Sequence, residues 1–362
     1  MTTRTDRPDF VMGNTRLRAR WHTLLDGPAR ARLAGRDLPG LVAGLRGTAH
    51  GAFLGAVTGT GRDDRPAVLR AVEERRRTAL RGVGQVYRER AGEVVAVLLA
   101  RYDLADTLTL LRGAAHHLPE EDVLAALHGV GAVTPTAARE VVAEEPEAVV
   151  QRLTAARLPD PGTARALAGA WDRYLLHGDL PELETAVARA ASARADGRLA
   201  ELGRPAERLR RFLADERDAA NLLSALRCRN AGRAPEALPE RLLPPGQLSV
   251  GALVAVAAGG GPPPGLPAAW RGAVDRALAT GRAAELAGEL EEHRAQQALA
   301  GWRTGDPLGV DVPLGFTAAV EVEARELRRV VLLAEPGSGE PEGPAGPAAT
   351  ASARTPRAGV PA

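Results

Sequence analysis

Apolar residues recur at steps of three, four and seven positions over most of the chain, which is the period of a helix that buries one face. The stripe is easiest to follow before Gly232, where it consists of Leu209, Phe212, Leu213, Ala220, Leu223 and Leu226. The sequence has no sustained two-residue alternation of β-branched and polar residues, which is the pattern of a strand. From about residue 15 to about residue 333 the pattern therefore predicts an all-α protein.

Proline and glycine predict where these helices begin and end, because proline is favoured at the first helical position and glycine just beyond the last. Starts are predicted at Thr134–Pro135, Asp160–Pro161 and Pro205, and ends at Gly113, Gly197 and Gly232. The stretches 238–247 and 258–267 hold too much proline and glycine to be helix interiors. From residue 336 onward large apolar side chains nearly vanish, which predicts a disordered tail over 336–362.

One helical segment occurs twice in the sequence. Residues 102–112 read YDLADTLTLLR, and residues 217–227 read RDAANLLSALR. At an offset of 115 residues the alignment pairs Asp103 with Asp218, Asp106 with Asn221, and Arg112 with Arg227. The two segments therefore carry polar residues at the same two positions.

A weaker third copy, VEARELRRVVL over residues 322–332, places Glu323 and Glu326 at these two positions. A period near one hundred residues is longer than that of the common solenoid repeats, so we predict three related helical units instead. The predicted boundaries are 1–117 for the first unit, 118–234 for the second, 235–335 for the third and 336–362 for the tail.

In the second copy, Asp218 and Asn221 lie one helical turn apart at the edge of the apolar stripe. Asparagine is a poor helix-interior residue, because its amide competes with the backbone for hydrogen bonds. A buried polar group needs a partner, so we expect this pair to bind neighbouring backbone or arginine and to select one helix arrangement. The predicted role of the pair is architectural.

Composition limits the possible functions. The chain has neither lysine nor isoleucine, so all 47 basic residues are arginine, and 45 acidic residues leave a net charge of +2. The densest basic run, Arg75–Arg77, directly follows Glu73 and Glu74, so no nucleic-acid surface is predicted. A chain without lysine can form neither a P-loop nor a Schiff base.

No catalytic, cofactor or metal site is predicted. The seven histidines lack metal-ligand spacing, and Ser249 lacks the G-x-S-x-G context of a hydrolase nucleophile. The single cysteine, Cys228, allows no intrachain disulfide and no multi-cysteine zinc site, and is expected to be a small apolar helix residue in a reducing compartment. No apolar run reaches the roughly 20 residues of a membrane span, and the N-terminus has no apolar export segment.

The repeated segments resemble the signature of the C-type subunits of bacterial and archaeal V/A-type rotary ATPases, which correspond to the d-type subunits of the eukaryotic vacuolar ATPase. That signature is an aromatic or acidic residue, then Asp/Glu-x-x-Asn, then aliphatic residues ending in Leu-Arg. In the three copies it falls on Tyr102, Asp103, Asp106, Leu111 and Arg112; on Asp218, Asn221, Leu226 and Arg227; and on Glu321, Glu323, Glu326, Leu327 and Arg328.

Four further segments resemble the family in the same order: GNTRLRARWHTLL (13–25), LVAGLRGTAHGAFL (41–54), LLPPGQLS (242–249) and GDPLGVDVPLGFTAAVEVEARELRRV (305–330). The resemblance thus covers about residues 13–333. Asp106 and Glu326 stand where the family has asparagine, and His50 stands where it has tyrosine. After Arg328 an acidic segment replaces the family's basic one, so its usual C-terminal contacts are not expected.

The resemblance implies an all-helical funnel of three similar units around a central cavity, without cofactor, metal or bound nucleotide. It implies a non-catalytic central-stalk subunit that couples the rotor shaft to the proteolipid ring during ATP-linked proton or sodium transport. Such a subunit is peripheral at the cytoplasmic face of the cell membrane. The residues alone leave a second possibility open, a soluble helical scaffold or regulator that binds an acidic partner through an Arg-rich face, for which binding would be salt-sensitive.

Overall fold

The computed structural model describes residues 9–61, 64–143 and 145–335, and every regular element in those ranges is a helix. The prediction of an all-α protein is therefore confirmed. The predicted tail, 336–362, lies outside the described residues.

The elements, with η marking a 3₁₀ helix, are the following. The first group is α1 (Val11–Arg20), η1 (Trp21–Thr23), α2 (Gly27–Leu33), α3 (Leu38–Arg46), α4 (Gly51–Leu54) and α5 (Asp64–Gln85). The second is α6 (Glu89–Ala115), α7 (Glu120–Ala126), α8 (Pro135–Val141), α9 (Pro146–Ala155), α10 (Pro161–His177) and α11 (Leu180–Leu202). The third is η2 (Arg204–Ala206), α12 (Glu207–Asn230), η3 (Pro235–Arg241), α13 (Val250–Ala257), α14 (Ala268–Thr280), α15 (Ala283–Thr304) and α16 (Asp311–Leu333).

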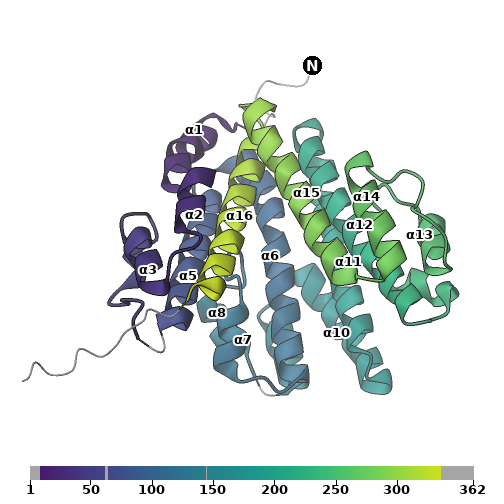
Figure 1. Ribbon diagram of the computed structural model, residues 1–362. Coiled ribbons are helices and arrows are strands. Elements are labelled where there is room, and N and C mark those ends of the chain that lie inside the picture. Colours follow the sequence, from purple (N-terminus) through teal and green to yellow (C-terminus); the bar gives the residue numbers. More distant parts are fainter. Residues whose placement is uncertain (1–8, 62–63, 144, 336–362) are drawn as a thin grey trace, which may run out of the picture.

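The two ends of the described chain pack against each other. Helix α16, drawn in yellow-green in Figure 1, lies beside the N-terminal helices α1, α2 and α5. Trp21 of η1 stacks on Trp302 of α15, with ring centroids 4.1 Å apart. The N-terminal helices therefore cover the side of α15 and α16, the last two helices of the described chain.

The buried apolar residues form one central cluster and three peripheral ones. Each of the three repeated helices, α6, α12 and α16, begins in the central cluster and ends in a peripheral cluster of its own. The peripheral partners are α7–α11 for α6, η3 and α13–α15 for α12, and α2–α5 for α16. The acidic repeat positions, Asp103, Asp218 and Glu323, lie where each helix passes from one cluster to the next.

Several predicted helix boundaries are confirmed. The side chains of Thr134 and Asp160 cap the starts of α8 and α10, each with proline at the next position. After α12, Gly232 has φ +60°, and Arg233 donates its N–H to the carbonyl of Cys228 at 3.1 Å, closing the helix end.

Two predicted helix ends are wrong, because Gly113 lies inside α6 and Gly197 inside α11. A β-carbon at Gly113 would lie 2.4 Å from Cγ2 of Val123, so this glycine lets α7 pack closely on α6. At Gly197 nothing lies within 4 Å of such a β-carbon. Tertiary burial along α11 outweighs the roughly 1 kcal/mol that glycine costs in a helix.

Two proline assignments also need correction. Pro205 lies in the short helix η2, before α12 begins at Glu207. The stretch 238–247 was expected to be free of helix, yet η3 extends into it as far as Arg241 and includes Pro239. Arg189 of α11 donates to the carbonyls of Pro239 and Leu242, each at 2.7 Å, and so stabilises this 3₁₀ turn from outside.

None of the helices in the described ranges is both long enough and apolar enough to cross a bilayer.

Candidate functional site

The acidic repeat position binds backbone amides in both of the stronger copies. Asp103 on α6 accepts a hydrogen bond from the N–H of Val133 at 2.9 Å, thirty residues further along the chain. Asp218 on α12 accepts from the N–H of Leu248, also thirty residues away, and from Gly246 and Gln247 at 3.0 and 2.6 Å. Burial raises the pKa of both carboxyl groups, and the donated N–H groups offset part of that effect. Each carboxylate therefore fixes one connection against its long helix.

These two connections match each other at the offset of 115 residues. Gly131 and Gly246 are equivalent, and a β-carbon on either would lie 2.2 or 2.6 Å from an oxygen of Asp103 or Asp218. The connections then end at equivalent helix caps, Thr134 and Ser249. The repeat therefore extends beyond the helices into the connections, and the shared glycine and helix cap are its signal in the sequence.

The second polar position differs in chemistry between the copies. Asp106 accepts from two N–H groups, those of His128 at 2.6 Å and Gly129 at 2.8 Å. Asn221 instead pairs with both polar groups of Leu243, accepting from its N–H at 2.7 Å and donating to its carbonyl at 3.1 Å. A carboxylate can accept from two donors, whereas an amide matches one donor and one acceptor. The replacement of asparagine by aspartate at 106 thus follows from what its connection offers.

Burial raises the pKa of Asp106 to about 6, against the lowering effect of the His128 and Gly129 amides. The charge of Asp103 raises this pKa further, and the charge of Arg76 lowers it. The first copy therefore holds two buried carboxyl groups one turn apart, whereas the second copy holds only one at these positions.

The third copy uses the beginning of the chain as its partner. Glu323 on α16 is buried, accepts from the N–H of Leu25, and lies 3.0 Å from Nε2 of His50. One turn later, Glu326 pairs with Arg30 of α2. No connection follows α16 within the described residues, so the N-terminal segment takes its place.

Residues two positions before each acidic position meet at the centre of the molecule. Arg101 on α6 lies 3.7 Å from Glu216 on α12, and Arg294 on α15 approaches the same carboxylate at 3.4 Å. The equivalent residue of α16, Glu321, acts electrostatically on Arg101. The side chains of Arg101 and Glu216 remain 26% and 31% exposed, so water reaches this group of charges. We call Arg101, Glu216 and Glu321 the hub.

Electrostatics favour the charged states of Arg101 and Glu216. Burial alone would raise the pKa of Glu216, but the positive charges of Arg101 and Arg294 outweigh burial and lower it. The pKa of Arg101 is raised in spite of burial, mainly by Glu216. The central ion pair is therefore ionised near neutral pH.

Arg76 of α5 extends the hub to the N-terminal helices. Its buried guanidinium binds Glu73 on the same helix and Glu321 on α16, the latter at 2.7 Å. Tyr102 donates its hydroxyl to Glu321 at 2.7 Å. Neither Arg76 nor its contact with His128, 2.6 Å away, was anticipated from the sequence, because the contact joins residues 52 positions apart.

The arginines that end the three signatures are not brought together. Arg112 pairs with Glu184 of α11, and Arg328 reaches Glu73 at 3.3 Å. Arg227 lies in the last turn of α12. The three arginines therefore lie at separate places in the fold and share no partner among the described residues.

Cys228 and Ser249, which were considered as reactive residues, take part in packing and helix capping. Cys228 is buried in the peripheral cluster of α12, and Ser249 caps α13 by accepting from the N–H of Ala252. Within the described ranges no three His, Cys, Asp or Glu side chains are grouped so that they could hold a metal ion.

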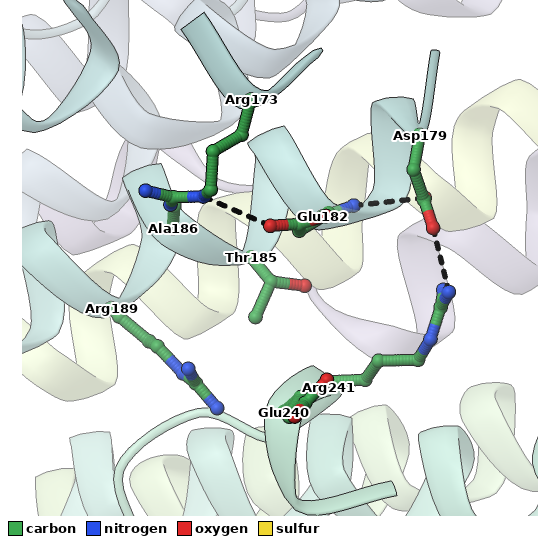
Figure 2. A pocket seen from close by; sticks show the side chains of 8 residues that line it. All are labelled: Arg173, Asp179, Glu182, Thr185, Ala186, Arg189, Glu240 and Arg241. Atoms are coloured by element: carbon green, nitrogen blue, oxygen red, sulfur yellow. Dashed lines mark hydrogen bonds and ion pairs between the residues drawn. The ribbon is translucent and has the colours of Figure 1, made fainter. Parts of the chain in front are cut away.

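A pocket of about 340 Å³ lies where the α10–α11 turn faces η3 (Figure 2). Arg173 pairs with Glu182 at 3.0 Å, and Arg241 pairs with Asp179 at 2.7 Å. Arg189, the third arginine of the lining, is engaged by the backbone of η3. With its guanidinium groups already partnered, the pocket is a polar seam between two peripheral clusters.

Comparison with known proteins shows the family of the chain. The family model described as "ATP synthase (C/AC39) subunit" matches residues 13–333, which includes the three repeated helices and the hub. The search of curated proteins gave no match. The chain belongs to the family of C/AC39 subunits of V/A-type ATP synthases.

Proposed function

We propose that the chain is a non-catalytic central-stalk subunit of a V/A-type rotary ATPase or ATP synthase. It couples the rotating shaft to the proteolipid ring during ATP-linked proton or sodium transport. The observation that carries this proposal is the family match over residues 13–333. As in the family it resembles, the chain would form a funnel with a central cavity and be peripheral at the cytoplasmic face of the membrane.

The hub supports a mechanical role. It ties the three repeated helices together through charged side chains, while Asp103, Asp218 and Glu323 hold the surrounding segments to the same helices. A subunit that transmits torque must not deform between its two ends. Close packing with satisfied buried polar groups gives that rigidity.

One end of the molecule offers an apolar contact surface. Asn14 of α1 donates to the carbonyls of Pro307 and Gly309, which joins α1 to the α15–α16 connection. At this joint Met12 is 61% exposed and Leu308 is 55% exposed. Exposed apolar side chains on neighbouring segments are typical of a surface that binds another protein.

The opposite end carries a second apolar surface. Helices α6 and α11 run antiparallel, and Arg112 near the end of α6 pairs with Glu184 near the start of α11. At this end Leu118, Leu175 and Leu176 are exposed. A subunit between shaft and ring needs one contact surface at each end, and we assign these two groups of residues to that purpose.

The test is made in the organism that carries the gene. The tagged chain is expected to co-purify with the ATPase head and the proteolipid ring. In a deletion strain, ATP-driven ion uptake by inverted membrane vesicles should be lost. An intact, fully coupled complex without this chain overturns the proposal.

A further inference from the structure

The ring of His128 lies between Arg76 of α5 and Tyr102 of α6. Nη2 of Arg76 is 2.6 Å from Nδ1 of His128, and the two aromatic rings meet edge to face with centroids 5.3 Å apart. A guanidinium group can only donate, so Nδ1 must accept. The imidazole is therefore neutral in this arrangement and carries its hydrogen on Nε2. A proton on Nδ1 would set two positive charges in hydrogen-bond contact.

Charged groups from three elements face this imidazole. Burial and the positive charge of Arg76 lower the pKa of His128 to about 4. Glu321 on α16 and Glu73 on α5 act in the opposite direction, and Arg101 on α6 adds to the lowering. The imidazole is thus held neutral by geometry and by its surroundings.

The connection that carries His128 is held from two sides. We call residues 127–134 the α7–α8 connection. On α6, Asp106 accepts from two of its amides, and Asp103 accepts from the amide of Val133, as Asp218 does in the equivalent connection on α12. On α5, Arg77 donates to the carbonyl of Leu127 at 3.0 Å, and Arg81 donates to that of Gly129 at 2.7 Å. The Arg76–His128 contact lies between these backbone contacts.

We propose that the Arg76–His128 contact is a proton-operated latch on the α7–α8 connection. When His128 takes up a proton at Nδ1, the bond from Arg76 is lost, and the connection leaves α5 and α6. Acidification thereby loosens the α7–α9 helices from the hub. This inference goes beyond the proposed function and does not depend on it.

Asp106 acts against the latch. A carboxyl group whose pKa is raised on burial takes up a proton more readily in the bound state, so acidification favours the bound connection at this residue. His128 has its pKa lowered on burial, and acidification favours the released connection. The pKa of His128 is about 4 in the bound connection and 6.5 when released, and that of Asp106 is about 6 when bound and 3.8 when released, so the two effects differ in size. Between pH 7.5 and 5.5 they amount to about tenfold towards release and about fourfold towards binding.

The experiment is amide hydrogen exchange of the full chain, followed by mass spectrometry at pH 7.5 and pH 5.5 and corrected for intrinsic rates. The matched control is inside the molecule. Residues 242–249 form the equivalent connection on α12, which contains no histidine and is held by Asp218 and Asn221. Circular dichroism verifies that each variant is folded.

On acidification, wild-type protection in 127–134 should fall about twofold relative to 242–249. In Asp106→Asn it should fall about tenfold, and in His128→Gln it should rise about fourfold. Opposite responses of the two variants support the latch. Responses of the same sign, or equal changes in both connections, overturn it.

A second measurement needs no variant. Exchange of the imidazole C2 hydrogen in the wild-type chain reports the titration of each histidine. For His128 the midpoint should lie below pH 5, and a midpoint at or above pH 6 overturns the latch.

Discussion

Asp106 and Asn221 occupy the same position in two repeated helices, and each is bonded to a residue 22 positions further along the chain, but they bind different backbone groups. Asp106 meets two donors, whereas Asn221 meets one donor and one acceptor. The helix is repeated, but whether aspartate or asparagine fits at this position depends on the donors and acceptors of the connection that packs on it.

Replacing Asn221 by leucine should destabilise the protein. The substitution removes the partner of both the N–H and the carbonyl of Leu243, whose bonds to Asn221 are partly buried, at a cost of about 1–3 kcal/mol. Urea denaturation at pH 7 measures the change. Asn230→Leu is the control, because Asn230 is exposed and makes one bond, to the carbonyl of Gly281. An unchanged midpoint for Asn221→Leu would show that the bonds between Asn221 and Leu243 do not stabilise the fold.

Asp106 should make stability depend on pH. Its pKa is raised from 3.8 to about 6 in the folded state, so its stabilising contribution is fully present below pH 3.8 and is lost as the pH rises through 6. Relative to wild type, Asp106→Asn should therefore gain about 2.4 kcal/mol between pH 4 and pH 7.5. Denaturation curves at both pH values give the difference. A pH-independent difference between the two proteins contradicts the assigned cause.

Alanine at Gly131 or Gly246 should destabilise the protein, because the added β-carbon meets the carboxylate of Asp103 or Asp218. Overpacking of this kind costs about 1–3 kcal/mol. Thermal unfolding compares these variants with Gly169→Ala, an exposed glycine of α10 with open space around its β-carbon, where alanine should be neutral or stabilising. Equal effects at Gly131 and Gly169 would exclude the close approach.

Loss of the hub charge should weaken the coupling between helices. Glu216→Gln leaves Arg101 and Arg294 without their shared carboxylate. Because the pairs are partly exposed, the loss in stability should be about 1 kcal/mol. A double-mutant cycle with Arg101→Gln isolates the interaction. A coupling energy of zero would mean that the Arg101–Glu216 pair does not stabilise the contact between α6 and α12.

The two apolar ends should act separately in assembly. Met12→Glu with Leu308→Glu should abolish binding at one end of the chain, and Leu175→Glu with Leu176→Glu should abolish binding at the other. Co-purification with the ATPase head and with the proteolipid ring measures the two losses. Ala269→Glu, at an exposed position of α14, is the charge control and should leave both intact. If both double variants keep both partners, the contact surfaces lie elsewhere.

The sequence by itself determined the helical class, the repeat of the α6 and α12 segments, the two cap-and-proline starts and the family. These features depend on local periodicity and on residue order, which can be recognised without knowing which other segments each helix contacts. The same local reading failed at Gly113, because a glycine that admits a neighbouring helix looks like one that ends a helix.

Only the tertiary structure decided which groups the polar positions bind. It brought Glu321 to Arg76 across 245 residues and Glu323 to Leu25 across 298. It also set the chemistry required at position 106 and placed His128 against Arg76. The physical reason is that the partner of a buried polar group is fixed by which distant backbone or side-chain atoms packing brings within about 3 Å, and helical periodicity contains no information about them.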